Sequence, residues 1–346
     1  MRPLPQALLV RELLAEYGDA ARARMRQYLR DAHPHEAPLQ TLVADYPERG
    51  GRALRASLCL AAASAFGARP EEALGPAVAL ELLHNAFLVH DDVEDESEER
   101  RGRPTLHQLH GVPVAVNVGD ALAVLSLRPL LDDVARLGPH LTLRVLEEAQ
   151  RMARESVEGQ ALELAWRQHN ATDLGEADYL RMVLKKTCWY TSIYPLRIGA
   201  LVGTRGTVDL ERFLRFGFFV GAAFQIQDDL LNLVGDEARY GKELNGDLRE
   251  GKRTLMLIHL LGALPAGERA RLSRLLAAPR AERTEAELRW VRGRMERHGS
   301  LEHARRVAHG LAGAALHEFS VAYAGMPDSR DKRFLEALPT WSIERT

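Results

Sequence analysis

Apolar residues recur along most of the chain at the three- and four-residue spacing of helices, while strand-like alternation of apolar and polar residues is rare. The segment 77–90 carries Leu80, Leu83 and Phe87 at this spacing and has apolar residues on nearly every face. The segment 210–233 has the same character. Because a helix that is apolar on most faces is a central one, the pattern predicts an all-α fold with these two helices in the middle of a bundle.

Turn signals divide the rest of the chain into further helices without marking a linker. Turns rich in Gly and Pro occur at 101–105, 110–113, 137–140, 203–207, 234–246 and 264–268. Neither an internal repeat nor a shift in composition separates two parts of the chain, so we expect a single domain over 1–346. The highly charged segment 282–319 predicts a pair of helices at the periphery.

Composition narrows the function classes. Lys and Arg number 46 against 48 for Asp and Glu, a formal net charge of −2, which excludes a nucleic-acid binder that works through bulk positive charge. The two cysteines, Cys59 and Cys188, do not form a CxxC pair, so we interpret them as buried apolar residues. No run of about 18 uncharged apolar residues is present, and we therefore expect no membrane span and a cytoplasmic protein.

An acidic cluster follows each of the two apolar segments. In Asp91-Asp92-Val93-Glu94-Asp95, the first and last carboxylates are four residues apart and share one helix face. The run Asp228-Asp229-Leu230-Leu231-Asn232 has the same arrangement with a final asparagine. One such run alone is more often a solvated helix end. Two of them facing each other across a bundle would instead bind Mg²⁺, which completes its coordination with water and phosphate oxygens, and this indicates a di- or triphosphate ligand.

Basic residues that could bind phosphate accompany both acidic clusters. Arginine is suited to bidentate phosphate contacts and lysine to point-charge contacts. Taken singly, each is better explained by a surface salt bridge, but together they support an anion site: Arg52, Arg55, Arg100, Arg101, Lys185, Lys186, Lys242 and Lys252.

Taken in order, these motifs resemble those of the trans-isoprenyl diphosphate synthases of the polyprenyl synthetase family. The match runs from about Gly50 to Leu255, most of the chain. It comprises GGRALR at 50–55, the first acidic motif with RRG at 100–102, VNVGDALA at 116–123, Glu158-Gly159-Gln160, KTCWYT at 186–191, FQIQDDLLNL at 224–233 and GKELNGDLREGK at 241–252. One DDxxD motif would be weak support, whereas seven elements in register are strong support.

The resemblance implies an isoprenoid-synthase helical bundle around a central, largely apolar cavity. It implies Mg-dependent head-to-tail condensation of isopentenyl diphosphate with dimethylallyl, geranyl or farnesyl diphosphate, in a homodimer. The implied metal ligands are Asp91, Asp95 and Asp228, supported by Asp92, Asp229 and Asn232. The implied allylic diphosphate site is Arg100, Lys186, Lys242 and Lys252, and the implied isopentenyl diphosphate site is Arg52, Arg55, His84 and Arg101. Among the implied catalytic residues, Lys186, Thr187 and Gln225, the last two direct oxygens at the carbocation.

Product length in such a fold depends on what closes the cavity beneath the first acidic motif. Phe87 and Ala86 lie four and five residues before Asp91, and Leu83 lies one turn deeper still. A helical turn rises about 5.4 Å, comparable with one isoprene unit. Family members with short products resemble this layout with bulk at both positions, whereas only Phe87 is bulky here. We therefore expect a medium-chain all-trans product, with C20 favoured and C15 next.

Two departures and two alternatives accompany this interpretation. Arg52 stands where the family commonly has Lys, which keeps the charge, and Asn232 replaces a final Asp, which we interpret as a subfamily feature. A non-catalytic partner subunit of a heteromeric synthase should have lost one acidic motif, and both are present. A class I terpene cyclase shares the fold, but residues 228–236 do not supply its second metal motif.

Overall fold

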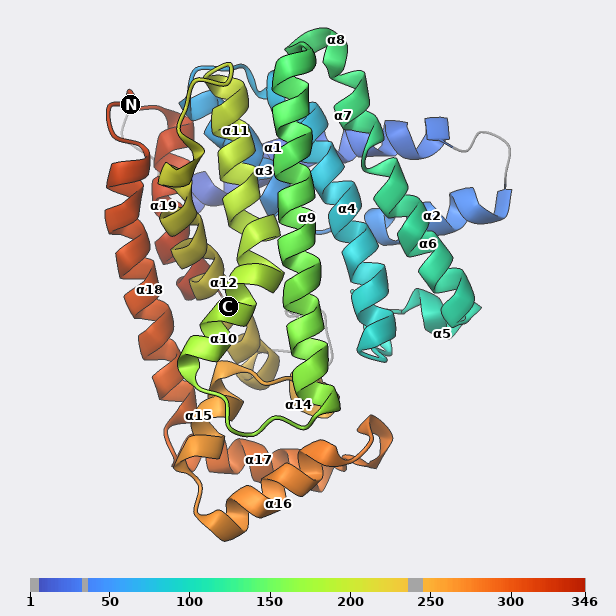
Figure 1. Ribbon diagram of the computed structural model, residues 1–346, viewed down its shortest axis with the longest axis vertical. Coiled ribbons are helices and arrows are strands. Elements are labelled where there is room, and N and C mark those ends of the chain that lie inside the picture. Colours follow the sequence, from blue (N-terminus) through green and yellow to red (C-terminus); the bar gives the residue numbers. More distant parts are fainter. Residues whose placement is uncertain (1–5, 33–36, 236–244, 346) are drawn as a thin grey trace.

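The computed structural model describes residues 6–32, 37–235 and 245–345 of the 346. The described residues form an all-helical bundle with one two-stranded ladder (Figure 1), which confirms the predicted fold class. The first half contains α1 (Gln6–Ala32), α2 (Ala37–Glu48), α3 (Leu54–Ala65), α4 (Leu74–Glu94), β1 (Glu99–Arg100), β2 (Arg103–Pro104), α5 (Leu106–His110), α6 (Val112–Leu125), α7 (Arg128–Asp132), α8 (Val134–Leu137) and α9 (Pro139–Gln168).

The second half completes the bundle and adds a smaller group of helices at one end (Figure 1). It contains α10 (Glu176–Val183), a π-helical segment (Leu184–Ile193), α11 (Tyr194–Gly203), α12 (Leu214–Val234), α14 (Gly246–Glu250), α15 (Leu255–Ala263), α16 (Ala266–Ala277), α17 (Glu285–Arg297), α18 (Ser300–Ala322) and α19 (Arg330–Glu344). Short 3₁₀ turns cover Pro70–Ala73, Leu210–Phe213 and Arg280–Glu282.

The two helices predicted to be central are α4 and α12. Each is preceded by one of the 3₁₀ turns, so that α12 begins at Leu214, four residues later than its apolar pattern. In the 3₁₀ turn, the Asp209 side chain accepts the backbone N–H of Glu211, which satisfies a donor that the helix leaves unpaired. Both helices end at their acidic clusters, and the two ends border one cavity. Cys59 and Cys188 are buried free thiols, as expected.

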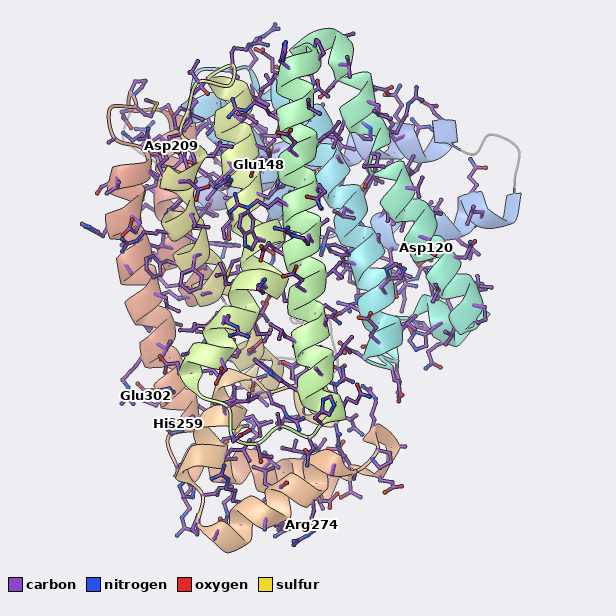
Figure 2. The ribbon with its side chains drawn as sticks, in the orientation of Figure 1. Asp120, Glu148, Asp209, His259, Arg274 and Glu302 are labelled. Atoms are coloured by element: carbon purple, nitrogen blue, oxygen red, sulfur yellow. The ribbon has the colours of Figure 1, made fainter. Side chains whose placement is uncertain are left out.

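A buried ion pair joins two of the helices that surround this centre. Arg197 of α11 is fully buried and donates from Nε and Nη2 to the two carboxylate oxygens of Glu148 on α9, at 2.7 and 2.9 Å. Figure 2 labels Glu148 where α9 and α11 run side by side. A bidentate pair of this kind fixes the relative placement of two helices more than it adds net stability.

The turn after the first acidic motif is a tight hairpin. Arg100 pairs with Arg103 in the β1–β2 ladder, and the two residues between them, Arg101 and Gly102, have φ values of 55° and 69°. Positive φ at both central positions is the geometry of a two-residue type I′ turn, which glycine favours at the second position. The ladder sends Arg100 into the protein, where its side chain is buried.

The segment with the KTCWYT motif is π-helical over Leu184–Ile193. Such segments place side chains at spacings that an α-helix does not allow and occur frequently at functional sites. Gly159 of α9 packs directly on it, because a Cβ at this position would lie 2.1 Å from the backbone nitrogen of Lys186. The glycine of the Glu158-Gly159-Gln160 motif is thus a contact point between α9 and the π-helical segment.

The charged segment 282–319 forms two helices, α17 and most of α18. α17 lies at the end of the bundle, and α18 runs along α12 at the outer edge of the bundle (Figure 1). Its buried residues Ala304, Ala308, Ala312, Ala315 and Phe319 repeat about every fourth position. Phe319 packs edge-on against Phe216 of α12 at 5.5 Å between ring centres. The other faces of α18 carry many charged and polar residues, so the composition of the segment does not show the alanine stripe.

Two segments are long and apolar enough to cross a membrane by length and composition. In Pro70–Glu94, which includes α4, 72% of the apolar 18-residue window is buried in the bundle, and in Val112–Leu137 the share is 44%. The search of the sequence for an uninterrupted apolar run did not find these two segments, because each contains polar residues. α4 has the burial of a core helix, whereas the second segment leaves part of its apolar surface exposed.

The contact at Gly159 can be tested by adding one methyl group. We expect Gly159→Ala to lower the free energy of unfolding by about 1–3 kcal/mol, because the added carbon overpacks against the backbone of the π-helical segment. Gly310→Ala in α18 is the control, since a Cβ there meets no atom within 4 Å, and it should be neutral or stabilise by up to about 1 kcal/mol. Urea unfolding of both variants measures the difference, and equal effects would contradict the packing described.

Candidate active site

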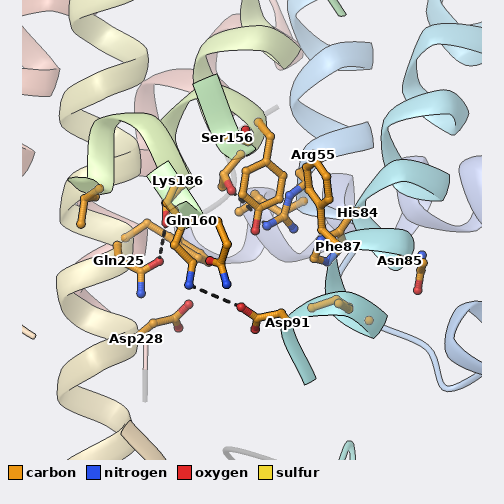
Figure 3. A pocket seen from close by; sticks show the side chains of 18 of the residues that line it. Arg55, His84, Asn85, Phe87, Asp91, Ser156, Gln160, Lys186, Gln225 and Asp228 are labelled. Carbon is orange, nitrogen blue, oxygen red and sulfur yellow. Dashed lines mark hydrogen bonds and ion pairs between the residues drawn. The ribbon is translucent and has the colours of Figure 1, made fainter. Parts of the chain in front are cut away.

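A cavity of about 830 Å³ lies between α4, α12 and the π-helical segment. Figure 3 shows side chains from these elements pointing into it. It brings together most of the residues that the sequence singled out, namely Arg52, Arg55, His84, Phe87, Asp91, Arg100, Arg101, Lys186, Thr187, Gln225, Asp228, Asp229 and Lys252. The cavity lining does not include Leu83, Ala86, Asp92, Asp95 or Asn232. Lys242 lies outside the described residues.

The first two aspartates of α4 have different environments. The Asp91 side chain is 23% exposed in the cavity, with Lys186 Nζ at 3.4 Å and Arg100 Nη2 at 3.7 Å. Asp92, one residue further around the helix, is fully buried and accepts hydrogen bonds from Arg100 and from the Tyr46 hydroxyl, the latter at 2.5 Å. Asp91 is therefore available to a ligand, whereas Asp92 holds Arg100 in place.

Asp95 ends the first motif as the C-terminal cap of α4. It is buried between Arg167 of α9 and Lys252, whose Nζ lies 2.6 Å from Oδ2. Burial raises the pKa of Asp95, and the charge of Lys252 opposes that rise. Burial also disfavours the charge of Lys252, but Asp95 and Glu250 outweigh it and raise the pKa of this lysine well above its ordinary value. Lys252 therefore stays charged at the edge of the cavity.

The second motif ends α12 on the other side of the cavity. Asp228 faces inward and pairs with Arg345 at 2.7 Å. Asp229 accepts hydrogen bonds from Gln225 Nε2 at 2.7 Å and from the Tyr179 hydroxyl at 2.8 Å. Burial, with the nearby Asp247 carboxylate, raises the pKa of Asp229 to about 8. Asp228 and Asp229 thus differ in the same way as the first pair, because consecutive helix positions point in directions about 100° apart.

Asn232, expected to support the metal, makes two hydrogen bonds to the backbone of a later segment. Its Oδ1 accepts the backbone N–H of Asp247 at 3.1 Å, and its carbonyl accepts the N–H of Asn245 at 2.9 Å. The side chain is buried. An amide suits this position because it accepts a backbone hydrogen bond without placing a further charge beside Asp229.

Lys186 lies between the two acidic helix ends (Figure 3). It pairs with Glu163 of α9 as well as with Asp91. Burial opposes its charge, but these two carboxylates outweigh burial and raise the pKa of Lys186. The next residue, Thr187, donates its hydroxyl to Gln225 Oε1 at 3.0 Å. The π-helical segment thus places a fixed positive charge and a hydroxyl side by side over the cavity.

The predicted isopentenyl diphosphate residues gather at another part of the cavity. Arg55 stacks on Tyr190 at 4.3 Å from the ring centre and donates to Thr191 Oγ1 at 3.0 Å. Burial lowers the pKa of Arg52 and of Arg101, and neighbouring arginines lower both further. Mutual repulsion among neighbouring guanidinium groups is the situation that a bound anion relieves.

His84 completes this group. Burial, reinforced by Arg55, lowers the pKa of His84 well below its ordinary value, so the ring is neutral. Within the described part of the chain, His84 Nδ1 and Arg55 Nε are buried without a hydrogen-bond partner. Because buried polar atoms in folded proteins are nearly always paired, these two indicate a ligand that supplies hydrogen-bond partners.

Of the three residues expected to form the cavity floor, Phe87 reaches the cavity. Its ring packs edge-on against Tyr190 at 5.8 Å between ring centres. Ala86 is fully buried in a core cluster that includes Val118 and Leu122 of α6, and Leu83 packs partly buried against the main core.

Two residues that line the cavity, Arg345 and Tyr190, were not among those predicted from the sequence. Arg345 reaches the second acidic motif from just beyond α19 and stacks on Phe224 at 3.7 Å. Nothing in a local pattern connects it to a helix more than a hundred residues away. Tyr190 could have been found, because it lies in the KTCWYT motif one turn after Lys186.

The acidic residues fit a metal shared with a ligand. Among the described residues, no group of three or more histidine, cysteine or acidic side chains converges on one point, so a cation would need oxygen atoms from elsewhere. Asp91 and Asp228 present carboxylates from opposite helices, on either side of Lys186 (Figure 3). A few carboxylates completed by water and phosphate oxygens are typical of Mg²⁺ bound with a phosphorylated substrate.

Comparisons with known proteins agree with this geometry. Residues 36–292 match the model of the polyprenyl synthetase family. A short chain isoprenyl diphosphate synthase of Methanothermobacter thermautotrophicus is 33% identical over 86% of this chain and 88% of its own. A (2E,6E)-farnesyl diphosphate synthase of Mycobacterium tuberculosis is 35% identical over 73% of this chain and 69% of its own.

Solved structures show the same architecture. The geranylgeranyl pyrophosphate synthase of Corynebacterium glutamicum, solved with isoprenyl diphosphate and magnesium, superposes with a TM-score of 0.85 at 25% identity. The superposition covers 96% of this chain and 99% of that one. The fold and site therefore define a trans-prenyltransferase of the geranylgeranyl and farnesyl diphosphate synthase type. The chain belongs to the polyprenyl synthetase family.

The different environments of Asp91 and Asp92 predict different costs on removal. We expect Asp92→Ala to lower the free energy of unfolding by about 3–5 kcal/mol, because it leaves buried Arg100 without its main partner. Asp91→Ala should cost less than about 1 kcal/mol, since Arg100 keeps Asp92 and Lys186 keeps Glu163. Denaturant unfolding without added metal compares the two variants, and a larger loss for Asp91→Ala would contradict these assignments.

Proposed function

We propose that the protein condenses isopentenyl diphosphate head-to-tail with dimethylallyl, geranyl or farnesyl diphosphate and releases a medium-chain all-trans prenyl diphosphate, C20 in preference to C15. The observation that carries the proposal is the presence of two basic groups in one cavity. One, formed by Lys186, Lys252 and Arg100, lies beside the acidic helix ends, and the other contains Arg55 and His84. Two anionic substrates thus have separate places.

The allylic diphosphate belongs in the first group. Lys186 and Lys252 now pair with Asp91 and Asp95, and an incoming diphosphate with its cation would replace these contacts. Asp91 and Asp228 would hold Mg²⁺, with Asp95 entering once Lys252 turns to the phosphate. When bound, Mg²⁺ would neutralise negative charge on the leaving diphosphate. The lysines and Arg100 supply further positive charge where the electron pair of the breaking C–O bond arrives.

The second substrate belongs beside Arg52, Arg55, Arg101 and His84. Neutral His84 can donate one hydrogen bond to a phosphate oxygen without adding charge, and the arginines supply bidentate contacts. The isopentenyl double bond then attacks the allylic C1, and the carbocation that follows loses a proton to the released diphosphate. Thr187 and Gln225 direct oxygens at the positive carbon, while Phe87 and Tyr190 form an apolar wall that excludes water.

Product length depends in this proposal on Phe87. Its ring and that of Tyr190 meet edge-to-face at the cavity wall, and a growing chain ends where it meets them. Ala86 leaves the lining unobstructed because it packs toward α6. One bulky side chain in place of two supports a product longer than C15, and therefore C20.

We also propose that the protein is a cytoplasmic homodimer. An exposed apolar strip covers the segment from α6 to α8 and includes Val112, Val116, Val124, Leu127, Leu131 and Val134. Val124 is 71% exposed, which is unfavourable in water unless another surface covers it. Sedimentation equilibrium should give twice the chain mass, and Val124→Asp together with Leu131→Asp should give the monomer mass.

The activity itself is tested with purified protein, Mg²⁺, labelled isopentenyl diphosphate and allylic primers of five, ten and fifteen carbons. Chromatography of the dephosphorylated products should show a dominant C20 alcohol. A terpene cyclase would instead release a hydrocarbon without consuming isopentenyl diphosphate. A non-catalytic partner subunit would give no product from any primer, and either result would overturn the proposal.

Loss of either cavity-facing carboxylate should abolish turnover. We expect Asp91→Ala and Asp228→Ala each to lower kcat at least about 10³-fold, equivalent to roughly 4 kcal/mol of barrier, while the helical circular dichroism spectrum is unchanged. The double variant should be little worse than either single one, because the two side chains serve one metal cluster. Near-normal turnover by either variant would refute their assignment as ligands.

Shortening Phe87 should lengthen the product. In Phe87→Ala we expect chains longer than C20, because the edge-to-face contact with Tyr190 is lost and the floor opens. Leu83→Ala is the control, since Leu83 lies on the same helix but outside the cavity lining, and it should keep the wild-type product. If Phe87→Ala folds and makes wild-type products, Phe87 is a packing residue and the proposed floor is wrong.

A further inference from the structure

The turn that presents Arg52 and Arg55 has an unfavourable backbone conformation. Gly50, Gly51 and Ala53 have φ values of 83°, 142° and 47°. Glycine accepts positive φ readily, but alanine in the left-handed region is strained. A turn of this kind keeps one conformation only where its surroundings hold it.

This turn also leaves the start of α3 without a cap of its own. Ala53 occupies the N-cap position and has no side-chain acceptor for the first backbone N–H groups of the helix. A residue from another helix takes this role. Glu81 of α4 reaches across and accepts the backbone N–H of Ala56, the third residue of α3, at 3.1 Å.

Glu81 is well placed to do more than cap the helix. It is 7% exposed, lines the same cavity as the arginines, and sits ten residues before Asp91 on α4. Burial raises the pKa of Glu81, and Arg55, Arg101 and Arg22 oppose that rise. Arg22 also holds the turn from α1, donating to the Gly51 carbonyl at 3.0 Å. Arg22 therefore holds the turn at Gly51, and Glu81 holds the helix that follows the turn at Ala56.

We propose that Glu81 is a positioning residue for the isopentenyl diphosphate site: by capping α3 from α4, it fixes the strained 50–53 turn and so the direction in which Arg52 and Arg55 enter the cavity. The inference rests on the proposed function for the identity of the anion. On this inference, the hydrogen bond between Glu81 of α4 and the backbone of Ala56 in α3 contributes to substrate binding. The same helix that carries the first metal-binding aspartate then also sets the second anion site.

Two substitutions separate the reach of the side chain from its charge. Glu81→Asp keeps the charge but withdraws the acceptor by one methylene, whereas Glu81→Gln keeps the acceptor in place and removes the charge. We expect Glu81→Asp to raise KM for isopentenyl diphosphate about tenfold, with kcat and the allylic KM within about twofold of wild type. Such a pattern reports lost binding of one substrate. Glu81→Gln should stay within about threefold for all three constants.

The backbone supplies a readout that is independent of turnover. Amide hydrogen exchange in a peptide covering 50–60 should accelerate in Glu81→Asp and stay near wild type in Glu81→Gln. Glu318→Asp is the matched control, because Glu318 is 8% exposed, pairs with Arg215 and does not line the cavity. It should change neither KM nor exchange in this peptide.

The outcomes distinguish this inference from the proposed function. An inactive wild-type protein would refute the proposed function. With an active wild type, an unchanged isopentenyl KM in Glu81→Asp, an equal rise in both substrate constants, or a tenfold rise in Glu81→Gln would each overturn the role of Glu81. If Glu81→Asp does not fold, Glu81→Ala takes its place, with a selective rise in the isopentenyl diphosphate KM supporting the role and an unchanged one refuting it.

Discussion

The concentration of negative charge at the ends of α4 and α12 is the constraint around which the site is built. Asp91 and Asp228 face one cavity from opposite sides, and Asp95 and Asp229 are buried just behind them. Buried carboxylates are costly without counter-charge, and the structure supplies it from four different elements: Lys186, Lys252, Arg167 and Arg345. Lys186, Lys252 and Arg345 also line the cavity. In the proposed function, a metal-bound diphosphate would attract these three cations away from their carboxylate partners.

On both helices, one aspartate of the adjacent pair is buried among hydrogen-bond donors and the other lies at the surface of the cavity. Asp92 and Asp229 are buried in the protein, where their carboxylates accept hydrogen bonds. Tyr46 and Arg100 donate to Asp92, and Gln225 and Tyr179 donate to Asp229. Asp91 and Asp228 remain at the cavity surface. In the proposed function, the adjacent aspartates of α4 therefore have different tasks, because Asp92 holds Arg100 and leaves Asp91 to bind the metal. The π-helical segment has a similar division, with Lys186 toward the acids and Thr187 toward Gln225.

The fold class, the two central helices and the motif residues that line the cavity were predictable from the sequence, because helical periodicity and motif order are local or sequential signals. The contribution of Arg345 was not, since it depends on how α19 returns to α12. The sequence also did not show that Phe87 lines the cavity while Ala86 packs away from it, because which face of α4 meets the cavity depends on neighbouring helices. The packing of α18 on α12 was also not predicted, because the alanine stripe of α18 lies among polar and charged residues.

The central claim is that Asp91 and Asp228 share one metal–diphosphate cluster. A crystal structure with Mg²⁺, isopentenyl diphosphate and a thio-analogue of the allylic substrate that cannot ionise tests it most directly. The account predicts Mg²⁺ coordinated by Asp91 and Asp228 and by the analogue's phosphate oxygens, with Lys186 and Lys252 turned from their carboxylates to the diphosphate. Metal bound without either aspartate, or a diphosphate bound while both lysine–aspartate pairs stay intact, would contradict it.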